Sequence, residues 1–185
     1  MTDDESLRRL LLERSVERGD FVLASGRRST FYIDCRRSTM SAEGMVLIGR
    51  MGWAAIQRSG WRASAVGGLT MGADPVAYAI AAASLGSEHP VDAFSVRKQL
   101  KEHGTGRLIE GNFKSGDRVI IVEDVITTGD SAQRASRAVE DAGGRIVGVL
   151  AVVDRQEGGR HSLEAAGHQV IALTTVADLG LGDNR

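Results

Sequence analysis

Two adjacent carboxylates and a hydroxyl-rich turn form the stretch of this chain with the clearest chemical potential. Glu123 and Asp124 directly follow an apolar, β-branched run at 119–122, which is typical of a strand buried on both faces of a parallel sheet. A small polar turn at 127–131 comes next, and apolar residues then recur at helical spacing. The order of strand, acidic pair, turn and helix predicts a ligand site where the strand ends.

The turn and the carboxylates suit different parts of one ligand. A helix N-terminus presents unpaired N–H groups and a partial positive charge, and Gly129 allows close backbone approach, so the turn is expected to bind phosphate. Carboxylates repel phosphate, so the pair points to a ligand with hydroxyls beside its phosphate, such as a ribose phosphate with Mg²⁺ nearby. The pattern alone also fits a structural strand and a helix capped by Asp130.

Composition favours one α/β domain and excludes several other classes. The chain has 185 residues and a net charge of −1, which gives no sign of a nucleic-acid-binding surface. Cys35 is the only cysteine, so an internal disulfide is excluded and a reducing, cytoplasmic compartment is expected. The acidic N-terminus does not resemble a signal peptide, and no apolar run is long enough to predict a transmembrane helix.

Strands and helices alternate along the chain, which predicts a parallel sheet with helices on both faces and a ligand at the carboxyl ends of the strands. Strands are expected at 21–23, 31–34, 63–68, 92–96, 119–122, 145–153 and 169–174. A first helix is expected around 7–12, capped by Ser6 or Asp4 and ended by Gly19. Two more helices are expected to begin after Ser41 and at about Asp74, and others to lie at 132–142 and 176–181.

The segment at 119–131, Val-Ile-Ile-Val-Glu-Asp-Val-Ile-Thr-Thr-Gly-Asp-Ser, closely resembles the phosphoribosyl pyrophosphate (PRPP) signature of type I phosphoribosyltransferases. Three further segments are similar to the orotate phosphoribosyltransferase family: an aromatic strand after a basic turn at 23–34, a cationic run at 97–107, and Asp-Arg-Gln-Glu at 154–157. The Gly-rich turn at 67–72 matches the family's pyrophosphate loop in position. Many relatives carry lysine at the position of Ala24, and some carry lysine at the position of Met71.

This resemblance implies a pentosyl transfer in de novo pyrimidine (UMP) biosynthesis. A glycosyltransferase of this family moves ribose 5-phosphate from PRPP to N1 of orotate, giving orotidine 5′-phosphate and pyrophosphate. The resemblance further implies the type I fold as a single domain over 1–185, with residues about 1–40 contributing to a small N-terminal hood. It also implies Mg²⁺ bound mainly through PRPP, and a homodimer in which the lid of one subunit reaches the site of its partner.

The resemblance also assigns roles to individual residues. The lid residues expected to be catalytic and to bind PRPP are Arg97, Lys98, Lys101 and His103. The remaining PRPP-binding residues are Glu123, Asp124, Val125, Ile126, Thr127, Thr128, Gly129, Asp130 and Ser131. The orotate-binding residues are Thr127, Arg155, Tyr32 and Ile33, with Arg155 expected to form a bidentate fork on the orotate carboxylate. No residue of the chain is assigned as a Mg²⁺ ligand.

Two other functions stay open from the sequence. A phosphoribosyltransferase for another base would share the same cradle, and only the hood and Arg155 argue against it. A non-catalytic regulator could use the fold to sense PRPP or a nucleotide. The full set of lid cations and the lack of an appended domain or basic patch argue against that regulator.

Overall fold

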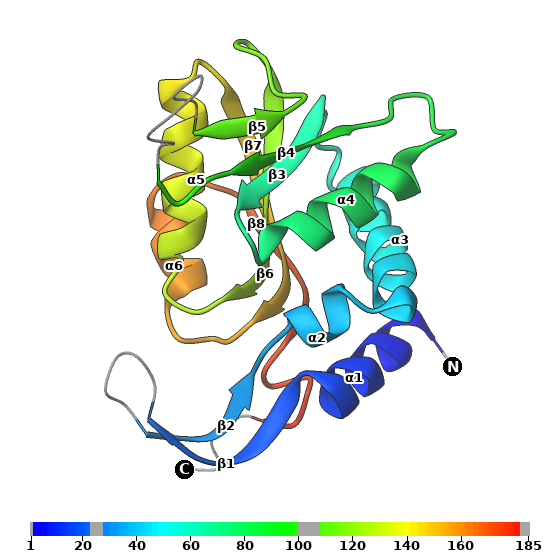
Figure 1. The fold of residues 1–185 in the computed structure, drawn as a ribbon, viewed down its shortest axis with the longest axis vertical. Helices are drawn as coiled ribbons and strands as arrows, with labels where there is room; N and C mark the ends of the chain where they lie inside the picture. Colours follow the sequence, from blue (N-terminus) through cyan, green and yellow to red (C-terminus); the bar gives the residue numbers. More distant parts are fainter. Residues whose placement is uncertain (1, 23–27, 100–107, 182–185) are drawn as a thin grey trace.

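A mixed sheet of six strands organises the fold (Figure 1). The computed structural model describes residues 2–22, 28–99 and 108–181. The strands run in the order β5-β4-β3-β6-β7-β8, and all neighbours are parallel except β5 and β4. Their bounds are β3 (Ala65–Leu69), β4 (Asp92–Val96), β5 (Ile109–Gly111), β6 (Arg118–Ile126), β7 (Arg145–Asp154) and β8 (Val170–Thr175).

Helices cover both faces of this sheet, as predicted (Figure 1). On one face lie α3 (Ala42–Ser59) and α4 (Ala73–Ser84), and on the other lie α5 (Asp130–Asp141) and α6 (Gly159–Ala165). Successive residues of β6 serve opposite faces: Ile120 packs in the apolar cluster with α3 and α4, and Ile121 packs in the cluster with α5. Among the described residues, no helix has both the length and the apolar character needed to cross a bilayer.

The N-terminal segment forms a small hood beside the carboxyl ends of the sheet (Figure 1). It consists of α1 (Asp3–Arg14), the antiparallel pair β1 (Val16–Val22) and β2 (Arg28–Ile33), and the short α2 (Arg36–Thr39). Leu7, Leu10 and Leu11 of α1 are fully buried in the same apolar cluster as α3. Hence α1 packs the hood onto the body of the protein, while β1 and β2 lie beside the carboxyl ends of the sheet strands.

Several element boundaries differ from those expected. Thr2, not Ser6 or Asp4, caps α1, because its hydroxyl accepts a hydrogen bond from the Glu5 N–H and the Glu5 carboxylate accepts one from Thr2. The helix ends at Arg14, and Gly19 lies inside β1. Ser41 caps α3 as predicted, through a bond from the Gly44 N–H.

Other differences concern short elements and strand ends. Three short elements, β5, α2 and α6, each of seven residues or fewer, were not predicted from the sequence. Residues 176–180 form consecutive turns rather than the expected closing helix. The most important difference is that β6 continues past residue 122 to Ile126, because it pairs with β7 as far as Ile126 and Asp154.

Candidate active site

A tight turn joins β6 to α5 and forms the predicted phosphate cradle. Gly129, with φ of 86°, is the residue that precedes the first turn of α5, so the cap is Gly129 and not Asp130. A Cβ at Gly129 would lie 3.0 Å from the Gly159 carbonyl oxygen, so both the backbone angle and the space require glycine. Thr128, Asp130 and Ser131 are exposed around the helix N-terminus. The turn therefore offers N–H groups and hydroxyls to an anion, although its role stays a prediction.

Glu123 lies inside β6 rather than beyond its end, and its carboxylate is almost completely buried. Only 5% of the residue is exposed, and Oε1 has no hydrogen-bond partner among the described residues. Burial raises the pKa of Glu123 well above its usual range, the negative charge of Asp124 raises it further, and the charge of Lys98 opposes both. A buried carboxylate oxygen without a partner is costly, so it indicates a place for a ligand hydroxyl.

Asp124 faces the Gly-rich loop between β3 and α4. A Cβ at Gly72 would lie 2.5 Å from Oδ1 of Asp124, which shows that the loop backbone passes directly against this carboxylate. Burial raises the pKa of Asp124, while the Val125 N–H, which donates to Oδ1 at 2.9 Å, and the charge of Arg36 lower it. The structure thus brings together the two predicted strand-to-helix loops at one carboxylate.

We expect Gly72→Ala to raise KM for PRPP roughly tenfold, because the new methyl group displaces the Asp124 carboxylate from its position. The backbone at Gly72 has φ of −62°, which alanine adopts readily, so the melting temperature should change little. Steady-state kinetics with a thermal melt of the same preparation checks both parts. A large loss of stability with unchanged KM would contradict this account of Gly72.

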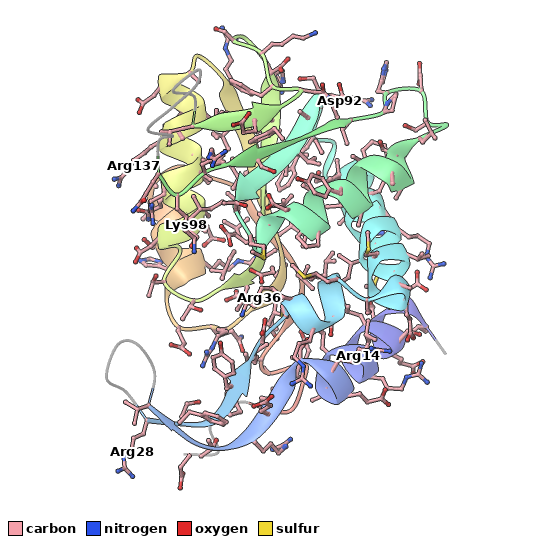
Figure 2. The ribbon with its side chains drawn as sticks, in the orientation of Figure 1. Arg14, Arg28, Arg36, Asp92, Lys98 and Arg137 are labelled. Carbon is pink, nitrogen blue, oxygen red and sulfur yellow. The ribbon has the colours of Figure 1, made fainter. Side chains whose placement is uncertain are left out.

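Arg97 and Lys98, the described residues of the predicted lid, lie near the N-terminal part of α5. Arg97 forms an ion pair of 3.2 Å with Glu110 of β5, and the Lys98 carbonyl accepts a hydrogen bond from Arg134 of α5 at 3.0 Å. Figure 2 shows Lys98 near α5. The positive charge of Lys98 lowers the pKa of Glu123 and so opposes the effect of burial. Lys101 and His103 fall outside the described residues. Arg134 was not singled out from the sequence, since its helical spacing alone suggests only an exposed face.

Arg155 lies where β7 ends, next to the end of β6 and under the hood. Its N–H donates to the Ile126 carbonyl at 2.9 Å, so Arg155 and Thr127 follow neighbouring strand ends. The residue is only 8% exposed, and its guanidinium carbon lies 5.2 Å from the centre of the Phe31 ring. Nη2 pairs with Glu157 at 2.7 Å, and Nε is buried without a hydrogen-bond partner among the described residues.

The side chains of the hood strand β2 alternate between a buried and a more exposed face. Phe31 and Ile33 are buried, whereas Tyr32 is 41% exposed and packs against Phe21 with ring centres 5.8 Å apart. The buried Phe31 contacts Arg155, which adds a residue to the predicted pair Tyr32 and Ile33, whose contact with orotate stays a prediction. The alternation of side chains along a strand is the signal that separates Phe31 from Tyr32.

The described side chains of the site do not by themselves form a metal centre. Within the described ranges, no three His, Cys, Asp or Glu side chains are grouped closely enough to hold an ion. Glu123 and Asp124 adjoin the phosphate turn, and this donor set suits an oxygen-preferring cation only if a ligand supplies further oxygens.

Comparison with known proteins identifies relatives over almost the whole chain. Residues 48–168 match the family model described as the phosphoribosyl transferase domain. Orotate phosphoribosyltransferase of Mycobacterium avium is 47% identical over 178 residues, which cover 96% of this chain and 97% of the relative. Orotate phosphoribosyltransferase of Aquifex aeolicus is 43% identical over 182 residues, which cover 97% of this chain and 98% of the relative. The crystal structure of Mycobacterium tuberculosis orotate phosphoribosyltransferase in complex with PRPP is 43% identical, with a TM-score of 0.82 over 97% of this chain and 100% of that chain.

Proposed function

The chain belongs to the orotate phosphoribosyltransferase family, and on that premise we propose how its residues divide the work of the reaction. The enzyme transfers ribose 5-phosphate from PRPP to N1 of orotate and releases pyrophosphate. The observation that carries the assignment of PRPP to this site is that Oε1 of Glu123, buried beside the turn proposed to bind phosphate, has no hydrogen-bond partner within 2–22, 28–99 and 108–181. A ribose phosphate supplies both a hydroxyl for that oxygen and a phosphate for the turn.

In this proposal each part of PRPP has its own binding group. The 5-phosphate lies on the turn at 127–131, where N–H groups and the helix dipole favour an anion. Glu123 and Asp124 accept hydrogen bonds from the two ribose hydroxyls. Arg97 and Lys98, together with Lys101 and His103 of the lid, hold the pyrophosphate. The C1–O bond to pyrophosphate breaks with its electron pair on the leaving group, so these cations stabilise the charge as it develops.

Orotate enters between the hood and the end of β7. Arg155 meets its carboxylate, Thr127 lies at the neighbouring strand end, and the hood residues Tyr32 and Ile33 are proposed to cover the ring, joined here by Phe31. N1 of orotate gives up its proton as its electron pair forms the new bond to C1, and the departing pyrophosphate can accept that proton, so no strong general base of the protein is required. The residues near the base therefore act by holding it in line with C1.

We propose that the enzyme uses Mg²⁺ and takes it up mainly with PRPP. Support comes from the chemistry of the site, since two carboxylates that hold the ribose hydroxyls cannot also complete an octahedral shell, so PRPP itself would supply most of the oxygen ligands. Bound there, the ion would neutralise part of the pyrophosphate charge.

A cytoplasmic location is also proposed, because the single cysteine, Cys35, is buried as a free thiol and suits a reducing compartment.

We further propose a homodimer in which each lid serves the partner's site. Lys101→Ala and Glu123→Gln each inactivate a different part of one composite site. Mixing the two variants, with subunit exchange, should therefore restore about a quarter of the wild-type sites, because half of the dimers are mixed and each has one intact site. Activity of the mixture, measured against each variant alone, checks this. No recovery, despite exchange demonstrated by tagged subunits, would place the lid in its own site.

The reaction is tested by the loss of orotate absorbance with purified protein, PRPP and Mg²⁺, beside runs with uracil, adenine and hypoxanthine. We expect turnover of orotate alone. Turnover of another base instead would keep the cradle and contradict the roles of Arg155 and the hood. Binding of PRPP without any turnover would favour the non-catalytic regulator.

A further inference from the structure

Arg36 occupies the first position of α2, between the hood and the carboxyl ends of the sheet (Figure 2). Asp34 holds its guanidinium through two hydrogen bonds, from Nε to Oδ1 at 2.8 Å and from Nη2 to Oδ2 at 3.0 Å. The Arg36 N–H also donates to Oδ1 at 3.1 Å. These bonds lower the pKa of Asp34, so both groups are charged at neutral pH and the arginine is fixed in orientation.

A guanidinium has two edges with paired donors, and Asp34 engages only one of them. Asp34 bonds to Nε and Nη2, which leaves the edge formed by Nη1 and the second hydrogen of Nη2. Throughout 2–22, 28–99 and 108–181 no acceptor bonds to that outer edge, and 48% of the side chain is exposed. The outer edge can therefore receive a phosphate group in the bidentate geometry that arginine favours.

The position of Arg36 selects which phosphate this would be. The helix α2, which carries Arg36, packs against α4, and Gly72 of the Gly-rich loop before α4 lies against the Asp124 carboxylate. The charges of Arg36 and Asp34 also act on the pKa of Asp124, in opposite directions. Asp124 is proposed to hold a ribose hydroxyl. In PRPP the pyrophosphate is on C1, next to the hydroxyl of C2, whereas the 5-phosphate is at the other end of the ring, on the turn at 127–131. A cation beside Asp124 thus lies on the pyrophosphate side.

We propose that Arg36 binds the pyrophosphate group of PRPP through its outer edge, and that Asp34 is a positioning residue for it. The proposal rests on the proposed function and adds a pyrophosphate contact outside the lid. As the C1–O bond breaks, its electron pair leaves with pyrophosphate, and N1 of orotate forms the new bond to C1 while its proton passes to the released pyrophosphate. The contact with Arg36 therefore strengthens as the leaving group gains charge.

The test compares Arg36→Met with Arg37→Met, a matched control. Arg37 is the next residue of α2 and is also ion-paired, with Glu17 of β1 at 2.6 Å. We expect Arg36→Met to raise both KM for PRPP and the inhibition constant of pyrophosphate about tenfold or more, with KM for orotate unchanged. Arg37→Met should behave as wild type. Arg36→Lys should recover part of the loss, and Asp34→Asn, which keeps the cation but frees it, should cause a smaller loss of the same kind.

Each alternative outcome decides against the inference or against its premise. Equal behaviour of the Arg36 and Arg37 variants would overturn it, as would a selective rise in KM for orotate, which would make Arg36 part of the base site. If Arg36→Met does not fold, wild-type pyrophosphate inhibition in both Arg36→Lys and Asp34→Asn would overturn it instead. If the wild-type protein shows no turnover, the proposed function fails. Calorimetry of pyrophosphate binding to the same proteins then tests Arg36 separately.

Discussion

Glu123→Gln is expected to lower kcat/KM for PRPP on the order of a hundredfold and to raise the melting temperature of the free protein. Activity falls because a neutral amide loses the charge that strengthens hydrogen bonds from the ribose hydroxyls. Stability rises because the wild-type carboxylate is 5% exposed, adjoins Asp124 and leaves Oε1 without a described partner. Removing a buried charge removes its desolvation cost.

The control for this substitution is Glu164→Gln on α6. Glu164 is exposed and pairs with Arg160 at 3.0 Å, so its loss removes the same charge far from burial. Neither activity nor stability should change by more than a small factor. A rise in stability at Glu123 without any loss of activity would show that the carboxylate is not a PRPP ligand.

The pH dependence of stability gives an independent measure of the same carboxylate. The folded-state pKa of Glu123 lies above its ordinary value of 4.5, so the folded protein binds this proton more tightly than the unfolded chain does. The free energy of unfolding therefore falls as pH rises from about 4.5 through the folded-state pKa. Urea titrations across this range should show the stability gain of Glu123→Gln growing with pH. A gain that is constant with pH would contradict the raised pKa.

The buried strands and the position of the site were predictable because their signals are local. Runs such as 119–122 are apolar enough to be buried on both faces, and parallel strands bring their carboxyl ends to one edge. From these two facts the acidic pair and the phosphate turn were expected at one edge of the sheet, and the family resemblance added Arg155. The structure places Glu123, Asp124 and Arg155 there, on the neighbouring strands β6 and β7.

The remaining features depend on contacts between distant segments. The strand β6 includes Glu123 and Asp124 because β7 pairs with it as far as Ile126. Nothing in residues 123–126 alone indicates that pairing. β5 is a strand only because it pairs with β4 at the sheet edge. Phe31 became a site residue through its contact with Arg155, which is more than a hundred residues away in sequence. Local patterns carry no information about such pairs.

Arg155→Lys is expected to raise KM for orotate about thirty- to a hundredfold, because lysine cannot form a planar fork on a carboxylate, and the loss corresponds to about 2–3 kcal/mol. KM for PRPP should stay unchanged, since the guanidinium lies beside Phe31 rather than at the phosphate turn. Lysine also loses the stacking on Phe31, which adds to the effect. Steady-state kinetics with each substrate varied in turn measures both constants.

The sharper readout is discrimination between orotate and uracil, which lacks the carboxylate. If Arg155 is the carboxylate fork, the variant should lose affinity for orotate, while the affinity for uracil, measured as competitive inhibition, stays the same. Arg160→Lys is the control, because Arg160 is a neighbouring arginine that bonds Glu164 and the Val170 carbonyl instead. Equal losses for orotate and uracil would mean that Arg155 acts by supporting the hood through Phe31. A parallel loss of PRPP affinity would mean that it acts on the cradle, and in either case the base carboxylate would need another partner.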